Sequence, residues 1–180
     1  MHFSIFTTAL VSALPFITAS PLARRDAPTV LAGITKISYD IGNLTTLVAA
    51  YTGAATDNIL PLIIAVFGLK IDVTAVTNDT TASPTFTSAE SCFIADALTD
   101  LAPFTISLLT GIQAKAAEIS TGRITPVVED ALTGFLDDVN AMFTAITNAV
   151  VLASVAAVDP SQQQIAAAFT SAIATFNTTP

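Results

Sequence analysis

The sequence has few of the residues on which enzyme active sites and metal centres depend. In 180 residues there is one histidine, one cysteine and no tryptophan. The histidine is His2, at the extreme N-terminus, which excludes a histidine-dependent catalytic triad and the common zinc sites from the body of the chain. The one cysteine, Cys92, excludes an intramolecular disulfide. We therefore predict that the protein is not an enzyme and has neither a metal site nor a cofactor.

Positive charge is also scarce. Six Lys and Arg residues stand against 14 Asp and Glu residues, which gives a net charge of −8. Because phosphate contacts need a basic face, we expect no nucleic-acid partner. Glycoside hydrolysis would need two carboxylates across a sugar cleft, usually with aromatic platforms, yet the chain has no Trp and its only Tyr residues are Tyr39 and Tyr51. We interpret the three close carboxylate pairs as solvated helix faces: Asp96 with Asp100, Glu129 with Asp130, and Asp137 with Asp138.

The first 25 residues are predicted to be removed. Residues 1–20 are an apolar stretch that ends in small residues, the layout of a secretory signal peptide. Residues 21–25 form a pro-segment that ends in the dibasic pair Arg24-Arg25. We expect a mature domain of residues 26–180 that is secreted, extracellular or in the cell wall, with no transmembrane segment. Its four basic and 14 acidic residues would give a net charge of −10.

Three glycosylation sequons agree with a secreted protein. Their acceptor residues are Asn43, Asn78 and Asn177, each followed two positions later by Thr. Asn78 and Asn177 fall in segments that we interpret as a loop and a tail. We therefore predict a glycoprotein.

Hydrophobic periodicity predicts helices in the first half of the domain. The first is predicted to run from about Val30 to Tyr51, with Pro28 in its first turn, because apolar residues recur there at steps of four and three. The segment 57–76 is apolar nearly all round, which predicts a helix buried on most sides. A β-strand is the alternative, because Ile and Val are common in it and Gly68 weakens a helix. The polar segment 76–86 is predicted to be a loop.

Helix-start signals predict three more helices. Thr87 and Glu90 make a capping box at the start of a helix that should end at Gly122. Thr125-Pro126 opens the next helix, and a second capping box at Asp159–Gln162 opens the last. Short connections between long helices favour an all-α, single-domain antiparallel bundle of about five helices.

The predicted interior mixes many small residues with a few large aromatic ones. Two interpretations remain open: a well-packed core, or helices that stand apart around an apolar space. Lys70, Lys115 and Arg123 are the basic groups that could meet a lipid carboxylate. Helical phase and side-chain size select ten ligand-binding candidates: Ile63, Phe67, Phe104, Leu108, Ile112, Phe135, Val139, Met142, Phe143 and Ile146.

The overall pattern resembles a known family. The features that carry the resemblance are the signal peptide with a dibasic site, the heptad-like first helix, the capped third helix with Leu101-Ala102-Pro103, and an ending rich in Ala, Ser and Thr. Over Asp26–Phe176 the chain resembles the fungal hydrophobic surface-binding protein A family, which includes the cell-wall galactomannoproteins. The resemblance implies an all-helical fold. It also implies either adsorption to hydrophobic surfaces with recruitment of a secreted hydrolase, or capture of fatty acids inside the bundle.

We therefore expect a secreted, non-catalytic glycoprotein that binds a fatty acid, another lipid or a hydrophobic surface. The alternative is a structural mannoprotein or adhesion component of the wall whose interior is only core. A cavity of several hundred cubic ångströms would favour the first hypothesis, since ligand sites usually have that size, and a solid interior would favour the second.

Overall fold

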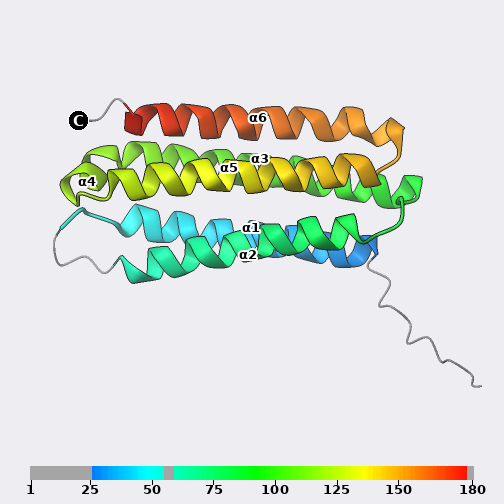
Figure 1. The fold of residues 1–180 in the computed structure, drawn as a ribbon, viewed down its shortest axis with the longest axis horizontal. Coiled ribbons are helices and arrows are strands. Elements are labelled where there is room, and N and C mark those ends of the chain that lie inside the picture. The colour runs from blue at the N-terminus through cyan, green and yellow to red at the C-terminus, as the bar shows by residue number, and fades with distance from the viewer. Residues whose placement is uncertain (1–25, 55–58, 178–180) are drawn as a thin grey trace, which may run out of the picture.

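The protein is all-helical, as the sequence predicts. The computed structural model describes residues 26–54 and 59–177, and within these ranges it contains helices but no strand (Figure 1). Thr56 and Asp57, where the second helix was expected to start, lie outside the described residues. The helices are α1 (Ala27–Ala50), α2 (Leu60–Thr81), α3 (Ser88–Ala114), the short α4 (Ala116–Thr121), α5 (Thr125–Ala149) and α6 (Leu152–Asn177).

The five long helices form a closed ring. Each packs mainly against two neighbours, in the order α1, α3, α6, α5, α2 and back to α1. Long helices that follow one another in the chain run in opposite directions. α1, α3 and α6 therefore run one way, and α2 and α5 run the other way (Figure 1). The ring therefore combines antiparallel and parallel neighbours, and α4 lies at one end of it between α3 and α5.

Local capping explains where the first and third helices begin. The Asp26 side chain accepts a hydrogen bond from the Thr29 N–H, and Pro28 occupies the first turn, where no intrahelical donor is lost. At α3 the predicted capping box is present. The Thr87 N–H donates to Glu90 Oε2 at 2.8 Å, while the Glu90 N–H donates to Thr87 Oγ1 at 3.4 Å. These bonds satisfy donors that every helix N-terminus leaves without a partner.

Two predicted boundaries are wrong because tertiary contacts decide them. The expected loop over 76–86 is helical as far as Thr81, since Val76 and Thr80 are buried against the bundle. The last helix begins at Leu152, so Pro160 lies inside it. Its first two turns are held by the burial of Ser154 and Val158, which outweighs the capping signal at 159–162.

The helix expected to end at Gly122 is divided in two. α3 stops at Ala114, and α4 follows after Lys115, whose backbone leaves the helical region. Thr125, expected to cap the next helix, is instead the first residue of α5, and Ile124 at the cap position makes no side-chain bond. The break turns α4 across the end of the ring.

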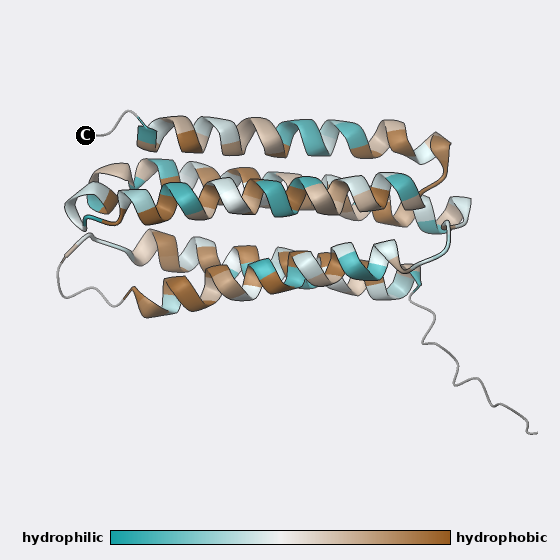
Figure 2. Cartoon of the chain, in the orientation of Figure 1, coloured by the Kyte–Doolittle hydropathy of each residue, from teal (hydrophilic) through white to brown (hydrophobic). Residues whose placement is uncertain are grey.

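The prediction that α2 is buried on most sides is also wrong. Its buried residues are confined to Leu69, Val73, Val76 and Thr80. A helix in a ring has one inner side, so the apolar residues on its other sides stay exposed. Figure 2 shows this as a concentration of hydrophobic residues at the N-terminal end of α2.

Two of the described helices, α2 and α3, are long and apolar enough to cross a membrane by length and composition alone. About two-fifths of the α3 window is buried inside the bundle, as expected for a core helix. The α2 window is mostly unburied, although the helix packs along α1 and α5. The expected lack of a transmembrane segment thus stays a prediction.

A charged cluster on the outside connects α1 to α2. Lys36 donates hydrogen bonds to Asp40 at 2.8 Å and to Asp72 across the helix pair. These bonds raise the pKa of Lys36 to about 12. Burial raises the pKa of Asp72, and a hydrogen bond with Asp72 lowers the pKa of Asp40. Because Lys36 is well exposed, this cluster contributes little to stability and mainly fixes which faces of the two helices meet.

The turn after α1 depends on one glycine. Gly53 has φ +76°, and a Cβ at this position would lie 2.4 Å from the Glu118 carbonyl oxygen of α4. We predict that Gly53→Ala lowers the free energy of unfolding by more than about 1 kcal/mol, because the residue would be strained and would displace α4. The matched control is Gly42→Ala in the middle of α1, where a Cβ would meet nothing within 4 Å. This substitution should raise the free energy of unfolding by about 0.5–1 kcal/mol. Urea unfolding followed by circular dichroism measures both, and equal effects would contradict this assignment.

Candidate functional site

One half of the ring is solid and the other half is hollow. Near the start of α1 and α3 the interior is filled by fully buried side chains such as Val30, Ile94, Leu98 and Val158. Toward α4 the helices enclose a cavity of about 590 Å³. Its wall comes mainly from the C-terminal halves of α1 and α3, the N-terminal half of α2, α5 from Val127 to Phe143, and Ile165 and Phe169 of α6.

The hollow follows from ring geometry. Five helices whose axes are about 10 Å from their neighbours stand about 8.5 Å from a common centre. A helix with its side chains has a radius of only about 5 to 6 Å, so the centre is empty unless large side chains reach into it. In the solid half such side chains do so. In the other half the volume lies within the range of about 300 to 1,000 Å³ usual for ligand pockets.

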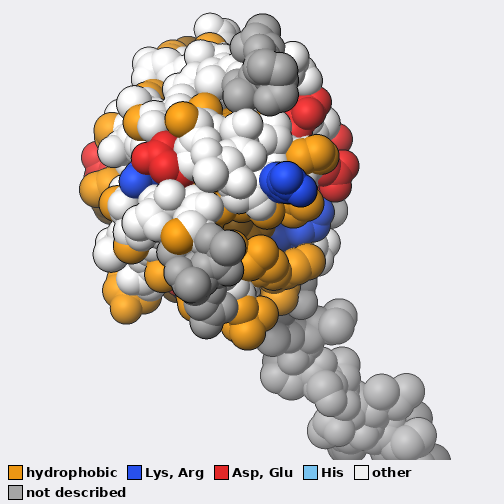
Figure 3. All heavy atoms as spheres, turned by 90° about the vertical axis from the view of Figure 1, so that its left-hand side faces the viewer, with side chains coloured by type: hydrophobic (Ala, Val, Ile, Leu, Met, Phe, Trp, Pro, Cys, Tyr) orange, Lys and Arg blue, Asp and Glu red, His pale blue; other side chains and the backbone are white. Residues whose placement is uncertain are grey.

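The cavity is lined almost entirely by apolar side chains and opens to solvent at the end of the ring near α4. Figure 3, which views the molecule from that end, shows hydrophobic side chains around a hollow with Lys or Arg side chains beside it. Tyr51, Ile119 and Ile124 line the cavity near this end. Phe135 and Phe169 meet in its wall with ring centroids 5.8 Å apart.

Most of the residues selected from the sequence come together in this wall. Phe104 and Ile146 do not. Phe104 is 54% exposed on the outside of α3, and Ile146 is fully buried in packed core away from the cavity. Helical phase puts a residue on the inner side of a helix but does not say at which height the ring is hollow. The eight that line the cavity are Ile63, Phe67, Leu108, Ile112, Phe135, Val139, Met142 and Phe143.

Among the described residues, the charged side chains that line the cavity are Lys70, Lys115 and Asp130. Of the three basic residues considered for a lipid head group, Lys70 and Lys115 line the wall, whereas Arg123 is an exposed residue outside it with φ 57°. Lys70 is paired with Asp138 of α5 at 3.0 Å. Lys115 is the more buried of the two lysines, and its contact with Glu118 is looser at 3.5 Å. Lys115 is therefore the cation best placed to meet an anionic group at the open end.

Several lining residues were missed from the sequence. Ile59 and Leu62 at the start of α2, and Val127 and Ala131 at the start of α5, belong to the wall. They lie at helix ends, where the hydrophobic stripe is irregular and the phase of the helix is uncertain. The signal that could have found them is the all-round apolar character of α2, which fits a helix with a cavity on one side and a further apolar contact on the other.

The three carboxylate pairs lie at separate places in the bundle, and of their members Asp130 near the start of α5 lines the cavity. Asp96 and Asp100 are exposed on the outer face of α3, and Asp137 is exposed on α5. Among the residues that the structure describes, no group of three Asp, Glu, Cys or His side chains is arranged to hold a metal ion. The arrangement of the described residues suits binding of an apolar molecule better than acid–base chemistry.

Comparison with known protein families shows to which family the chain belongs. The family model of hydrophobic surface binding protein A matches residues 27–148, from the start of α1 nearly to the end of α5. The chain belongs to this family. No curated protein sequence matches it.

Solved structures share the fold of this hydrophobic surface binding protein A member. AfMp4p of Aspergillus, crystallised with palmitic acid, has a TM-score of 0.79 and 27% identity, over 84% of this chain and 99% of AfMp4p. The second ligand-binding domain of the Penicillium marneffei MP1 protein, complexed with multiple arachidonic acids, has a TM-score of 0.78 and 16% identity. The match covers 87% of this chain and 99% of that domain. The first ligand-binding domain of MP1, also complexed with arachidonic acids, has a TM-score of 0.70 and 14% identity. The match covers 82% of this chain and 98% of that domain. The helical ring is thus a fold seen with fatty acids in other proteins.

The positions of the ten candidate residues allow a test of which side chains line the cavity. We predict that Phe104→Ala leaves the binding of an apolar fluorescent probe unchanged, because Phe104 faces solvent. Ile146→Val should cost about 1 kcal/mol of stability and also leave probe binding unchanged. Phe135→Ala should weaken probe binding at least fivefold, because it removes part of the cavity wall. Probe titrations with parallel unfolding curves measure both effects, and a loss of binding in Phe104→Ala would contradict the placement.

Proposed function

We propose that this protein is a secreted, non-catalytic carrier that holds the hydrocarbon chain of a fatty acid in the hollow half of its helical ring. The observation that carries the proposal is the apolar cavity of about 590 Å³ in a chain whose other half is packed solid. AfMp4p, with the same fold at 27% identity, was crystallised with palmitic acid, which supports the same class of ligand here.

The hydrophobic effect supplies the binding energy. Burial contributes about 0.8 kcal/mol for each methylene group, so a chain of about 14 methylenes gains roughly 11 kcal/mol before the costs of association. The cavity already exists in the described structure, so little protein surface has to rearrange to admit the chain. A polar molecule would leave polar atoms without partners against the apolar wall.

The proposed position of the carboxylate is the open end near Lys115. The protein carries a net charge of −8, so an anionic ligand needs local compensation. Lys115 lines the cavity beside the break between α3 and α4, and within the described ranges the loose contact with Glu118 is the ion pair that competes for its ammonium group. A hydrogen bond that involves a charged group is worth about 1.5–3 kcal/mol, enough to orient the chain with its tail inward.

A void-filling substitution tests the proposed ligand site. We expect Val139→Phe to reduce the affinity for palmitate at least tenfold without loss of stability, because the added ring occupies the cavity that Val139 lines. The matched control is Val158→Phe in the solid half. It should cost about 1–3 kcal/mol of stability through overpacking and change the affinity of the folded protein little. Calorimetric titration and urea unfolding give the two quantities, and unchanged affinity in Val139→Phe would contradict the proposal.

The position of the head group has its own test. Lys115→Met should weaken palmitate binding about tenfold, or about 1.4 kcal/mol, and should alter the binding of hexadecanol less than twofold. Hexadecanol has the same chain without a carboxylate, so the comparison isolates the charge. Lys36→Met on the outside of α1 is the control and should affect neither ligand. Equal losses for both ligands would show that Lys115 acts through the shape of the cavity and not through its charge.

The other expected properties remain part of the proposal. The acceptor residues Asn43, Asn78 and Asn177 are all exposed, which supports glycosylation during secretion, although Asn78 lies inside α2 and not in the expected loop. Secretion into the extracellular space or cell wall fits the membership in the hydrophobic surface binding protein A family. The size of the cavity favours a ligand-binding protein over the alternative of a purely structural mannoprotein. Recruitment of a secreted hydrolase stays a prediction.

A further inference from the structure

A row of large apolar side chains is exposed along the outer face of α2. Leu60, Ile64, Phe67 and Ile71 follow at steps of four, three and four, so they lie on one side of the helix. Each is between 56% and 67% exposed. We call these four residues the α2 row. The largest exposed apolar patch of a folded protein is often functional, since it promotes association with other apolar material.

The α2 row adjoins a side opening of the cavity between α2 and α5. Ile63, Phe67 and Val127 line the cavity and are at the same time exposed, so the cavity reaches the surface beside them. Across the seam, α5 presents small residues to the cavity, Ala131 and Gly134, and a Cβ added at Gly134 would meet nothing within 4 Å. We call this seam the α2–α5 portal.

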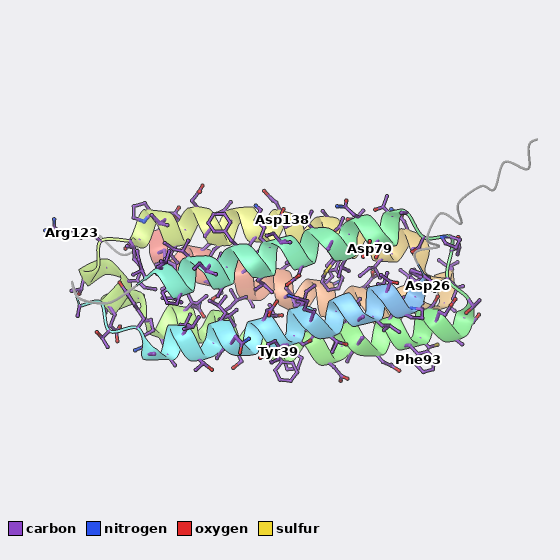
Figure 4. The ribbon with its side chains drawn as sticks, turned by 90° about the horizontal axis from the view of Figure 1, so that it is seen from below. Asp26, Tyr39, Asp79, Phe93, Arg123 and Asp138 are labelled. Carbon is purple, nitrogen blue, oxygen red and sulfur yellow. The ribbon has the colours of Figure 1, made fainter. Side chains whose placement is uncertain are left out.

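Charged side chains lie on both sides of the portal, since Asp130 of α5 lines the cavity one residue before Ala131. Further along the two helices, Lys70 and Asp138 form an ion pair at 3.0 Å across the seam. In Figure 4 Asp138 lies on α5 where it runs beside α2. A hydrocarbon chain passing through the seam would therefore cross between Asp130 and this pair, over Ala131 and Gly134 of α5 and past Phe67.

Charge also indicates what kind of surface the α2 row would meet. Residues 60–69 contain no charged side chain, and Lys70 and Asp72 flank only the last member of the row, Ile71. Docking on an anionic surface normally uses a cluster of Lys and Arg residues, and the net charge of −8 would oppose it. The row is also narrow, about 17 Å long and on the order of 400 Å² in area, roughly half of what each partner buries in a stable protein interface. An apolar helix face without charge fits the interfacial region of a neutral bilayer.

We propose that the α2 row docks on the surface of an uncharged phospholipid bilayer, and that the lipid chain passes between bilayer and cavity through the α2–α5 portal. The proposal rests on the proposed fatty-acid binding and adds the surface and the route. Direct transfer keeps the chain out of water, because Phe67 belongs both to the docked row and to the wall of the cavity. The ammonium and carboxylate of Lys70 and Asp138 would stay at the level of the head groups.

Transfer kinetics test the route. A fluorescent fatty acid is loaded into phosphatidylcholine vesicles and its movement to the protein is followed by stopped flow. The wild-type rate should rise in proportion to vesicle concentration, as expected for transfer by collision. Ile64→Gln with Ile71→Gln should lower the rate at least tenfold and leave the equilibrium affinity unchanged, because neither residue lines the cavity. A rate that does not depend on vesicle concentration, or an unchanged rate in this variant, overturns the proposal.

A matched control uses exposed aromatic residues elsewhere. Tyr39 of α1 and Phe93 of α3 are 70% and 60% exposed and point outward on another side of the bundle (Figure 4). Tyr39→Gln with Phe93→Gln removes a similar amount of exposed apolar surface and should leave the transfer rate unchanged. A loss equal to that of the α2 double variant would show that the effect is general stickiness, which also overturns the proposal.

Vesicle flotation of the ligand-free protein separates docking from ligand binding. The wild type should float with neutral phosphatidylcholine vesicles at both low and high salt, and the α2 double variant should not. If palmitate does not bind but flotation occurs as expected, the proposed function fails and the docking face stands. Flotation that requires anionic lipid, or a dimer in sedimentation that the α2 substitutions abolish without any flotation of the wild type, overturns the docking proposal.

Discussion

The architecture depends on the closure of five amphipathic helices around one axis. Each long helix buries its apolar stripe against two neighbours, and the ring leaves a central space that only large inward side chains can fill. Side chains such as Ile94, Leu98 and Val158 fill it in one half of the molecule. In the half toward α4 the space remains open as the cavity. Stability and binding are thus assigned to different halves of the same helices.

This division explains the unusual character of α2. A helix in the ring needs only one apolar side, yet the N-terminal half of α2 is apolar on its inner and outer sides. Burial in the core cannot account for the outer residues, because Leu60, Ile64 and Ile71 are exposed and do not line the cavity. Phe67 belongs to both sides, which makes the start of α2 the place where cavity, surface and solvent meet.

Much of the fold could be predicted from the sequence, because the physical signals were local. The stripe from Val30 to Tyr51 and the capping box at Thr87 gave the helices α1 and the start of α3 correctly. The break at Lys115 and the early start of α6 could not be predicted, since they depend on contacts between distant segments, such as the hydrogen bond from the Val151 N–H to Ser91 Oγ. For the site, helical phase placed Val139, Met142 and Phe143 on the inner side, but it could not show that the ring is solid at Ile146 and hollow one or two turns away.

The most direct test of the central claim, a preformed apolar cavity that holds one lipid chain, is native mass spectrometry of the secreted, deglycosylated protein with and without added palmitate. The account predicts a folded protein that carries a discrete additional mass in the fatty-acid range, either as isolated or after palmitate is added. A mass equal to the polypeptide alone under both conditions, from protein shown to be folded, would contradict the assignment of the cavity as a lipid site.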